Sequence, residues 1–387
     1  MRDWTLMKAT PLLLLLAATP ATADDAPSNT AVATAATRPV RPIVRLQAEG
    51  IEVDLELPAA LGGSYQGVRF DRGGMITQVR AAGHTHFGEW KHTRTGKAHD
   101  DVTGPGDEFG MERPWGFEEG APGDTFVKIG VGRLGVPPKK PARKGSTTGP
   151  AQDRDAPSPY LFHQKYELVD AGRWTVATEQ VDRLEFRHEL DAGPDGRRGY
   201  MYVKRLRLVA GASPALVIER ELTNTGSVPL NTDHYTHNFA QIDGTAVGPD
   251  YQIDLNAAAV ATEGRKFKAL ATVTDRTITF PQLIPPDRAA WSPLLPASAS
   301  PTTTAEAAPA ATWPSGTLFT VLNRRTGGRM TVSQDLAPVR VVLYARDLAA
   351  CVEPFIALHI LPGKTARWTT TYGFDAVEPQ GDATTGQ

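Results

Sequence analysis

Two side chains far apart in the sequence, a histidine and a glutamate, are the groups best suited to move protons. His237 lies in the aromatic run 235–239, and Glu353 lies in the otherwise apolar run 351–355. An imidazole and a carboxylate commonly serve as general acid and general base. The pair therefore predicts proton-transfer chemistry, provided that the fold brings the two segments together.

The segment around His237 is predicted to be a β-strand. Because side chains alternate between the two faces of a strand, one face would carry Tyr235, His237 and Phe239, and the other His234, Thr236 and Asn238. This places the histidine between two aromatic rings, as in the wall of a sugar pocket. A core histidine bonded to a backbone carbonyl is the alternative. A metal pair of the two histidines is disfavoured, since a spacing of three suits a helix face.

The segment around Glu353 is also predicted to be extended, because Pro354 restricts the residue before it. Cys351 would share a face with the carboxylate and supply a small apolar neighbour. Partial desolvation disfavours the charged form and makes a carboxylate a better base near neutral pH. The alternative is a solvent-exposed glutamate on an edge strand.

Both segments resemble the signature blocks of the aldose 1-epimerases (galactose mutarotases). In that family a strand, an Asn-x-Gly turn and a short spacer precede a histidine, and a glycine follows seven positions later; here the turn is 224–226 and the glycine is Gly244. In the second block a glutamate at the end of a strand is followed by a Pro-Gly turn, here 362–363, and a final strand. Thr236 departs from the family's usual Asn.

The resemblance implies a fold and a reaction. The fold would be all-β, a large antiparallel β-sandwich of the galactose mutarotase-like supersandwich type. Glu353 would take the proton of the anomeric hydroxyl while His237 protonates the ring oxygen, so that the sugar ring opens and recloses as the other anomer. No metal or nucleotide cofactor is required.

Residues of the first half are expected to bind the sugar. The segment 63–79 resembles the opening hairpin of mutarotase-like proteins, and 97–117 is a Gly-rich polar loop with an exposed-looking Trp115. The Asn-Arg and Leu-His-Gly-Gly motifs of typical aldose 1-epimerases are absent, and residues of this loop would replace them. The predicted substrate-binding residues are Arg69, His99, Glu108, Arg113, Trp115 and Tyr235.

Two other functions are compatible with the same fold. A polysaccharide lyase or hydrolase is the first; a uronate lyase would use Arg69 and Arg113 near the substrate carboxylate and His234 or Tyr235 as the base. A non-catalytic carbohydrate-binding protein is the second. A shared fold does not choose among these functions.

The elements that must position these residues are predicted to be strands. Period-2 alternation of apolar and polar residues marks strands at 51–57, 126–131, 184–190, 201–208, 216–222 and 339–344. Segment 329–345 reads as two strands joined by a Pro-containing turn. No segment combines helical periodicity with caps over more than about three turns. The pattern favours antiparallel β architecture.

The net charge of the chain bears on which classes of partner it can bind. The 387 residues carry a formal net charge of −2 and the sequence pI is about 6.5, so nothing indicates a nucleic-acid or anionic-membrane partner. Carbohydrate is the expected partner. Cys351 is the only cysteine, which excludes an intramolecular disulfide.

The N-terminus predicts export to a bacterial periplasm. A charged start, a short apolar run and the small-residue site Ala21-Thr-Ala23 make residues 1–23 a signal peptide, with no membrane attachment after cleavage. Residues 24–41 are expected to be a flexible leader, and 42–376 a single sandwich domain. Flexible insertions are predicted at about 136–159 and 294–316, and a disordered tail at 377–387.

Overall fold

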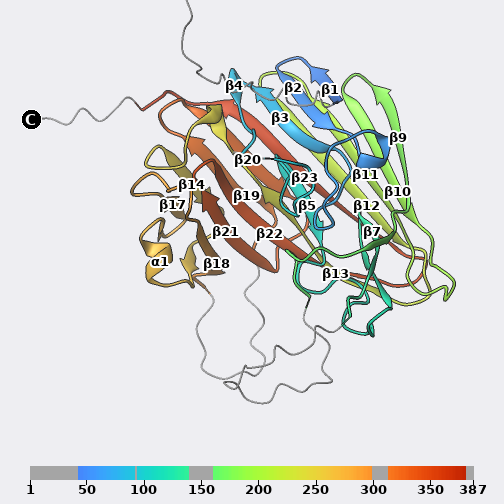
Figure 1. The fold of residues 1–387 in the computed structure, drawn as a ribbon. Coiled ribbons are helices and arrows are strands. Elements are labelled where there is room, and N and C mark those ends of the chain that lie inside the picture. Colours follow the sequence, from blue (N-terminus) through green and yellow to red (C-terminus); the bar gives the residue numbers. More distant parts are fainter. Residues whose placement is uncertain (1–41, 92–93, 139–159, 299–312, 381–387) are drawn as a thin grey trace, which may run out of the picture. The chain divides into compact units, whose positions relative to one another are not determined.

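The computed structural model describes residues 42–91, 94–138, 160–298 and 313–380, which belong to one compact unit (Figure 1). The predicted signal peptide and leader lie outside these residues, as do 139–159, 299–312 and 381–387. No helix in the described ranges is long and apolar enough to cross a membrane.

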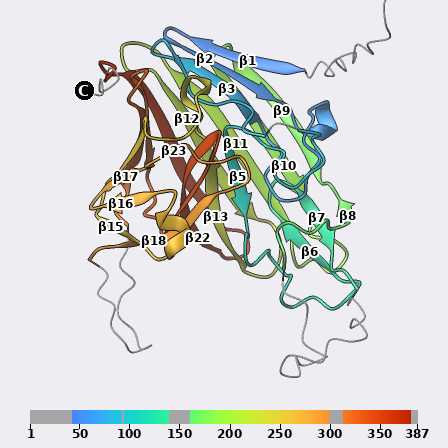
Figure 2. The ribbon, with the colours of Figure 1, turned by 60° about the vertical axis from the view of Figure 1, so that its left-hand side comes forward.

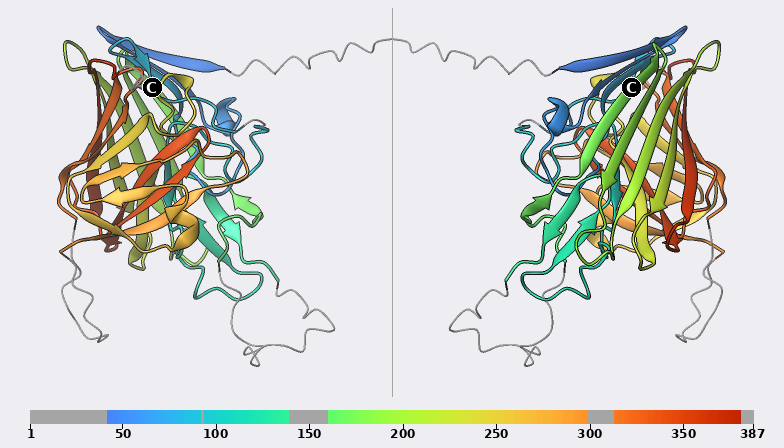
Figure 3. Two further views of the ribbon diagram at one scale, coloured as in Figure 1. Left: turned by 90° about the vertical axis from the view of Figure 1, so that its left-hand side faces the viewer. Right: turned by 90° about the vertical axis from the view of Figure 1, so that its right-hand side faces the viewer.

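The largest sheet has ten strands, and every pairing in it is antiparallel. Its green strands β9–β12 run side by side in Figure 3. The order is β16 (Thr272–Thr274), β17 (Thr277–Thr279), β14 (Tyr251–Leu255), β19 (Gly316–Asn323), β20 (Gly328–Gln334), β23 (Thr365–Ala376), β12 (Ala215–Asn224), β11 (Tyr200–Val209), β10 (Arg183–Leu190) and β9 (Arg173–Gln180).

The second sheet has six strands, again all antiparallel, and it carries both predicted catalytic residues. The order is β15 (Ala259–Ala261), β18 (Ala290–Pro296), β21 (Arg340–Arg346), β22 (Ala349–Ile360), β13 (Leu230–Asn238) and β5 (Pro105–Phe109).

Two small sheets and three short helices complete the described structure. The four-stranded sheet has the order β1 (Ile43–Ala48), β2 (Ile51–Glu56), β3 (Met75–Ala81) and β4 (His84–Thr85). The three-stranded sheet consists of β6 (Thr125–Lys128), β7 (Gly132–Gly135) and β8 (Leu168–Asp170), which lie together in Figure 2. The helices are η1 (Ala59–Leu61), η2 (Ile242–Gly244) and α1 (Arg265–Lys268).

The ten-stranded and six-stranded sheets pack face to face. One apolar cluster joins Val321 and Met330 of the larger sheet to Val341, Leu343 and Val352 of the smaller one, and all five are buried. Burying a side chain of this size contributes about 1.5–3 kcal/mol. We call the face of the six-stranded sheet that meets the larger sheet its inner face, and the opposite face its outer face. The prediction of an all-β, antiparallel sandwich is confirmed.

Two turns with characteristic residues connect strands of the two large sheets. Asn224 accepts a hydrogen bond from the amide of Gly226 (2.9 Å), so the Asn-x-Gly turn leads from β12 into β13. On the way back from β22 to β23, Gly363 has φ +71° and the amide of Lys364 donates to the carbonyl of Leu361 (3.0 Å). Proline followed by a glycine with positive φ is the signature of a type II turn.

The predicted strands are found, with differences at their ends. Strand β6 ends at Lys128 rather than 131, because Gly130 turns the chain with φ +74°. The two strands predicted in 329–345 exist as β20 and β21, but they belong to different sheets. The predicted opening hairpin at 63–79 is wrong, since only the residues from Met75 onward form a strand.

Three predicted boundaries also change. Leu294–Pro296 belong to β18 and pair with β15 and β21, so the predicted insertion begins too early. At its other end, Trp313 is buried in the main core. In the predicted tail, the amides of Val377 and Gln380 donate to the carbonyls of Gly327 and Arg324.

Candidate active site

Strands β13, β22 and β5 bring the candidate residues onto the outer face of the six-stranded sheet. Tyr235 pairs with Phe355 of β22 on one side and with Glu108 of β5 on the other, and His237 pairs with Gly106. Alternation along β13 places Tyr235 and His237 on the outer face, as predicted.

His237 and Glu353 are in direct contact. The Nε2 atom of His237 lies 2.9 Å from Oε1 of Glu353, and the two side chains are only 6% and 5% exposed. Glu353 lies within the long strand β22, not at a strand end as the family pattern predicts. Two segments more than a hundred residues apart therefore meet at an acid–base pair whose side chains are in contact.

Aromatic rings fix the orientation of the His237 imidazole. It stacks on Phe239 (ring centres 3.8 Å apart, planes 7° apart), and Tyr344 meets it at 81° with a centre distance of 5.2 Å. The ring of Phe70 lies 6.0 Å from it, with the planes at 62°. Within the described chain, Nδ1 of His237 has no hydrogen-bond partner. The imidazole is thus held by packing, with Nε2 2.9 Å from the carboxylate.

A second polar cluster lies on the same face around Glu108. This carboxylate accepts hydrogen bonds from Nε of Arg69 (2.7 Å), the hydroxyl of Tyr235 (2.6 Å) and Nζ of Lys128 (3.0 Å). Nη2 of Arg69 also donates to the Tyr235 hydroxyl (2.8 Å). Three of the predicted substrate-binding residues, Arg69, Glu108 and Tyr235, are thus brought together.

The cluster has a defined protonation state. Burial raises the pKa of Glu108, but the neighbouring Arg69 and Lys128 outweigh it and hold that pKa below its usual value. Burial raises the pKa of the Tyr235 hydroxyl well above its usual value. Tyr235 is therefore a hydrogen-bond donor to Glu108, and it is poorly suited to the base role that a lyase would require.

The other predicted binding residues lie elsewhere. Trp115, expected to be exposed, is 5% exposed, because it packs in the core and its Nε1 donates to the carbonyl of Pro229 (3.0 Å). Arg113 is 79% exposed beside Glu118. Both line a cavity of about 710 Å³, whereas His99 lines a different one of about 640 Å³.

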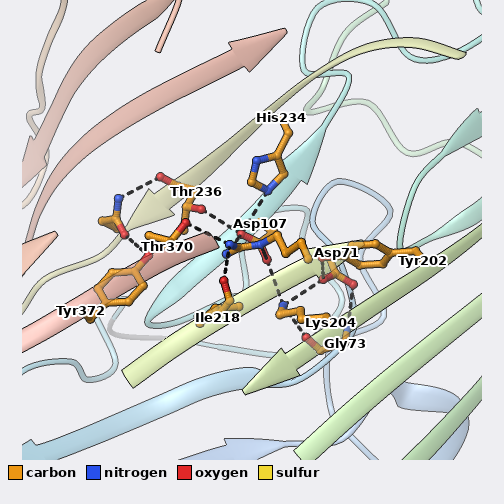
Figure 4. Close-up of polar contacts among 12 residues, drawn as sticks. Asp71, Gly73, Asp107, Tyr202, Lys204, Ile218, His234, Thr236, Thr370 and Tyr372 are labelled. Carbon is orange, nitrogen blue, oxygen red and sulfur yellow. Dashed lines mark hydrogen bonds and ion pairs between the residues drawn. The ribbon is translucent and has the colours of Figure 1, made fainter. Parts of the chain in front are cut away.

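The inner face carries its own buried network, centred on Asp107 (Figure 4). Arg220 binds both oxygens of this carboxylate (2.7 and 2.9 Å), and Lys204 bridges Asp107 (3.1 Å) and Asp71 (2.9 Å). The hydroxyl of Thr236 also donates to Asp107 (2.9 Å). Two carboxylates thus meet two cations between the sheets.

His234 belongs to this inner network. Its Nε2 lies 3.3 Å from Asp107, and burial lowers the pKa of the imidazole to about 4 even though the carboxylate opposes the shift. His234 is therefore neutral at pH 7 and points away from His237, which excludes a metal site shared by the two. Among the described residues, no group of three or more His, Cys, Asp or Glu could hold a metal ion.

Sequence patterns missed several residues of the site. Lys128 is a polar residue of the predicted strand 126–131, and it is buried against Glu108. Tyr344 and Phe70, which pack around His237, carry no local signal of their own. Only Tyr344's place in a predicted strand, two strands from β13, could have suggested its contact with the histidine.

Comparisons with known proteins find likeness at the level of structure. Searches against protein-family models and curated protein sequences return no match. Among solved structures, the chain is similar to an aldose epimerase homologue from Caenorhabditis elegans (12% identity, 87% of this chain and 99% of that one, TM-score 0.44). It is also similar to a galactose mutarotase-like protein from Clostridium acetobutylicum (11%, 86% and 95%, TM-score 0.47) and a galactose mutarotase related enzyme from Lactobacillus acidophilus (8%, 88% and 99%, TM-score 0.46). At these values the likeness says nothing of activity, so the chemistry of the site rests on its own geometry.

Proposed function

We propose that this protein is an exported enzyme of the aldose 1-epimerase type, which interconverts sugar anomers by acid–base ring opening. The observation that supports this proposal is the contact of 2.9 Å between His237 and Glu353, on one face of the six-stranded sheet. The sequence blocks around both residues resemble those of the family. The substrate would be a free saccharide.

An adjacent acid and base suit the geometry of this reaction. The anomeric hydroxyl and the ring oxygen of a sugar are bonded to the same carbon, so one side-by-side pair can serve both. In ring opening, Glu353 accepts the proton of the hydroxyl while protonated His237 donates to the ring oxygen. The sugar replaces the contact between the two side chains with a hydrogen bond to each of them. Rotation about C1–C2 and closure with the roles reversed give the other anomer.

The same pair serves the reaction in either direction. Ring opening leaves the proton of the hydroxyl on Glu353 and takes one proton from His237, and ring closure returns both. A complete turnover therefore takes up no proton from solvent, and either anomer is opened by the same form of the pair, carboxylate with imidazolium.

Substitution of each partner tests the assignment. Glu353→Gln removes the base and His237→Asn removes the acid, and each is expected to lower turnover by roughly 10²–10⁴-fold. Because both act in one step, the double variant should be little worse than the poorer single variant. Polarimetry of freshly dissolved aldoses measures the rate. Glu263→Gln, at an exposed loop position, is the matched control and should keep the wild-type rate.

The same assay separates the alternative functions. Near-wild-type turnover of Glu353→Gln would refute the proposal. An unsaturated, ultraviolet-absorbing product from oligomeric uronates would indicate a lyase instead, and saccharide binding without either reaction would indicate a binding protein.

Export is part of the proposal and is tested separately. N-terminal sequencing of the protein recovered from its native host is expected to begin near Asp24, because the small-residue site Ala21-Thr-Ala23 precedes it. Recovery of an uncleaved chain from the cytoplasm would contradict export while leaving the chemistry untouched.

A further inference from the structure

A second cavity, of about 640 Å³, has more cationic than anionic side chains in its lining. Its charged lining residues are three cations, Arg72, Lys97 and Lys165, and one carboxylate, Glu167. His99 and His163 also line it. Such a concave, cationic site raises the local concentration of anions.

Arg72 is the buried cation of this cavity, and it has no carboxylate partner among the described residues. It is 9% exposed, and it donates only to carbonyl oxygens: Nε to Gly67 (3.0 Å), and Nη2 to Gln66 (3.0 Å) and Gly67 (2.9 Å). Burial correspondingly lowers the pKa of its guanidinium.

Other buried cations of the protein differ in this respect. Arg69 and Lys128 contact Glu108, and Lys204 and Arg220 contact Asp107. A buried charge without a counter-charge is costly, so a guanidinium left in this state beside a cavity is suited to an anion that arrives from outside.

The cavity adjoins the face that carries the acid–base pair. The ring of Phe162 lies between them: Cζ of Arg69 is 4.3 Å from its centre, and the rings of His163 and His99 are 5.3 and 6.0 Å away. Cζ of Arg69 also lies 4.6 Å from the centre of the Phe70 ring, which contacts His237. A chain of touching side chains thus runs from the cavity to the imidazole.

We propose that the cavity lined by Arg72, Lys97 and Lys165 binds the carboxylate or phosphate of an anionic saccharide. This inference rests on the proposed function, which it deepens by naming the substrate class. A planar guanidinium binds both kinds of anion through paired hydrogen bonds, and the two lysines add charge at the rim.

Calorimetric titration with four probes tests the proposal: glucuronate, glucose 6-phosphate, glucose and inorganic phosphate. At least one anionic sugar is expected to bind about tenfold or more tightly than glucose and inorganic phosphate. If glucuronate binds more tightly than glucose 6-phosphate, the preferred anion is a carboxylate; the reverse order identifies a phosphate. Raised salt should weaken this binding and leave glucose unaffected.

Removal of the rim charges supplies the matched comparison. The double variant Lys97→Gln, Lys165→Gln should bind the anionic sugar roughly tenfold more weakly, since each partly exposed charge contributes modestly. The control Lys266→Gln, Lys268→Gln removes two exposed charges from α1 and should bind as the wild type. Arg72→Lys keeps the charge but loses the planar fork, and should also weaken binding if circular dichroism shows that it folds.

Two results would overturn the inference. Glucose binding as tightly as both anionic sugars would refute an anionic substrate, and unchanged affinity in the double lysine variant would refute this cavity as the site. Neither result bears on the acid–base pair, whose test is the turnover of Glu353→Gln. Anomer conversion of neutral aldoses with no anion preference would refute the inference alone.

Discussion

At the scale of single residues, two neighbours on β5 organise the polar interior. Asp107 points to the inner face and Glu108 to the outer face, because successive side chains of a strand alternate. Asp107 meets Arg220 and Lys204, and Glu108 meets Arg69. The inner network joins the two large sheets, while the outer one borders the candidate active site.

Glu108→Gln is expected to lower the free energy of unfolding by about 3–5 kcal/mol, because it leaves Arg69 and Lys128 buried without their counter-charge. Chemical denaturation measures the change. Glu118→Gln is the matched control, since Glu118 pairs with Arg113 in solvent and should cost at most about 1 kcal/mol. Equal losses in the two variants would show that the buried cluster does not contribute in this way.

At the scale of elements, β18 shows how a composition signal can mislead. Ala, Pro, Ser and Thr dominate 294–316, yet the first residues complete an interior strand between β15 and β21. The side chain of Leu294 points into the main core, and that of its neighbour Leu295 points to solvent. Pairing with β15 and β21 decides which of the two leucines is buried, and the amino-acid composition of the segment does not reveal that pairing.

The two leucines make a matched test of that assignment. Leu294→Ala is expected to lower the free energy of unfolding by about 2–5 kcal/mol, because it opens a cavity in the core around a side chain that is 1% exposed. Leu295→Ala, at a side chain that is 50% exposed, should change it by no more than about 0.5 kcal/mol. If urea denaturation shows similarly small effects for both changes, Leu294 is not part of the core and the predicted flexible insertion begins there after all.

At the scale of the whole molecule, buried histidines link stability to pH. His86, His188 and His234 lie in different parts of the fold, and burial lowers the pKa of each to about 4. In the unfolded chain the same groups have a pKa of about 6.5. Between these values the unfolded state binds more protons than the folded state, so stability rises with pH in this window.

Stability should therefore be fully present above pH about 6.5 and be lost progressively as pH falls toward about 4. Urea midpoints measured between pH 8 and pH 4 test this expectation. His188→Gln should reduce the slope, because it removes one of the three groups, whereas His359→Gln at an exposed position should leave it unchanged. A slope that is flat in the wild type would contradict the linkage.

The sequence by itself determined the fold class and the faces of the key strands. Alternation with period 2 in segments such as 201–208 and 216–222 fixed the strands, because a half-buried sheet demands it. The same rule placed Tyr235 and His237 on one face and His234 on the other. These are local properties, since each depends only on residues adjacent in the chain.

Only the tertiary structure decided which strands meet and what they cover. It brought Glu353 to His237, buried Trp115 and Lys128, and separated His99 from the acid–base pair. These outcomes depend on pairing between strands far apart in sequence, here β13 with β22 and β5. A side chain's own segment sets its direction, but the element packed against it decides whether it meets solvent, apolar groups or a counter-charge.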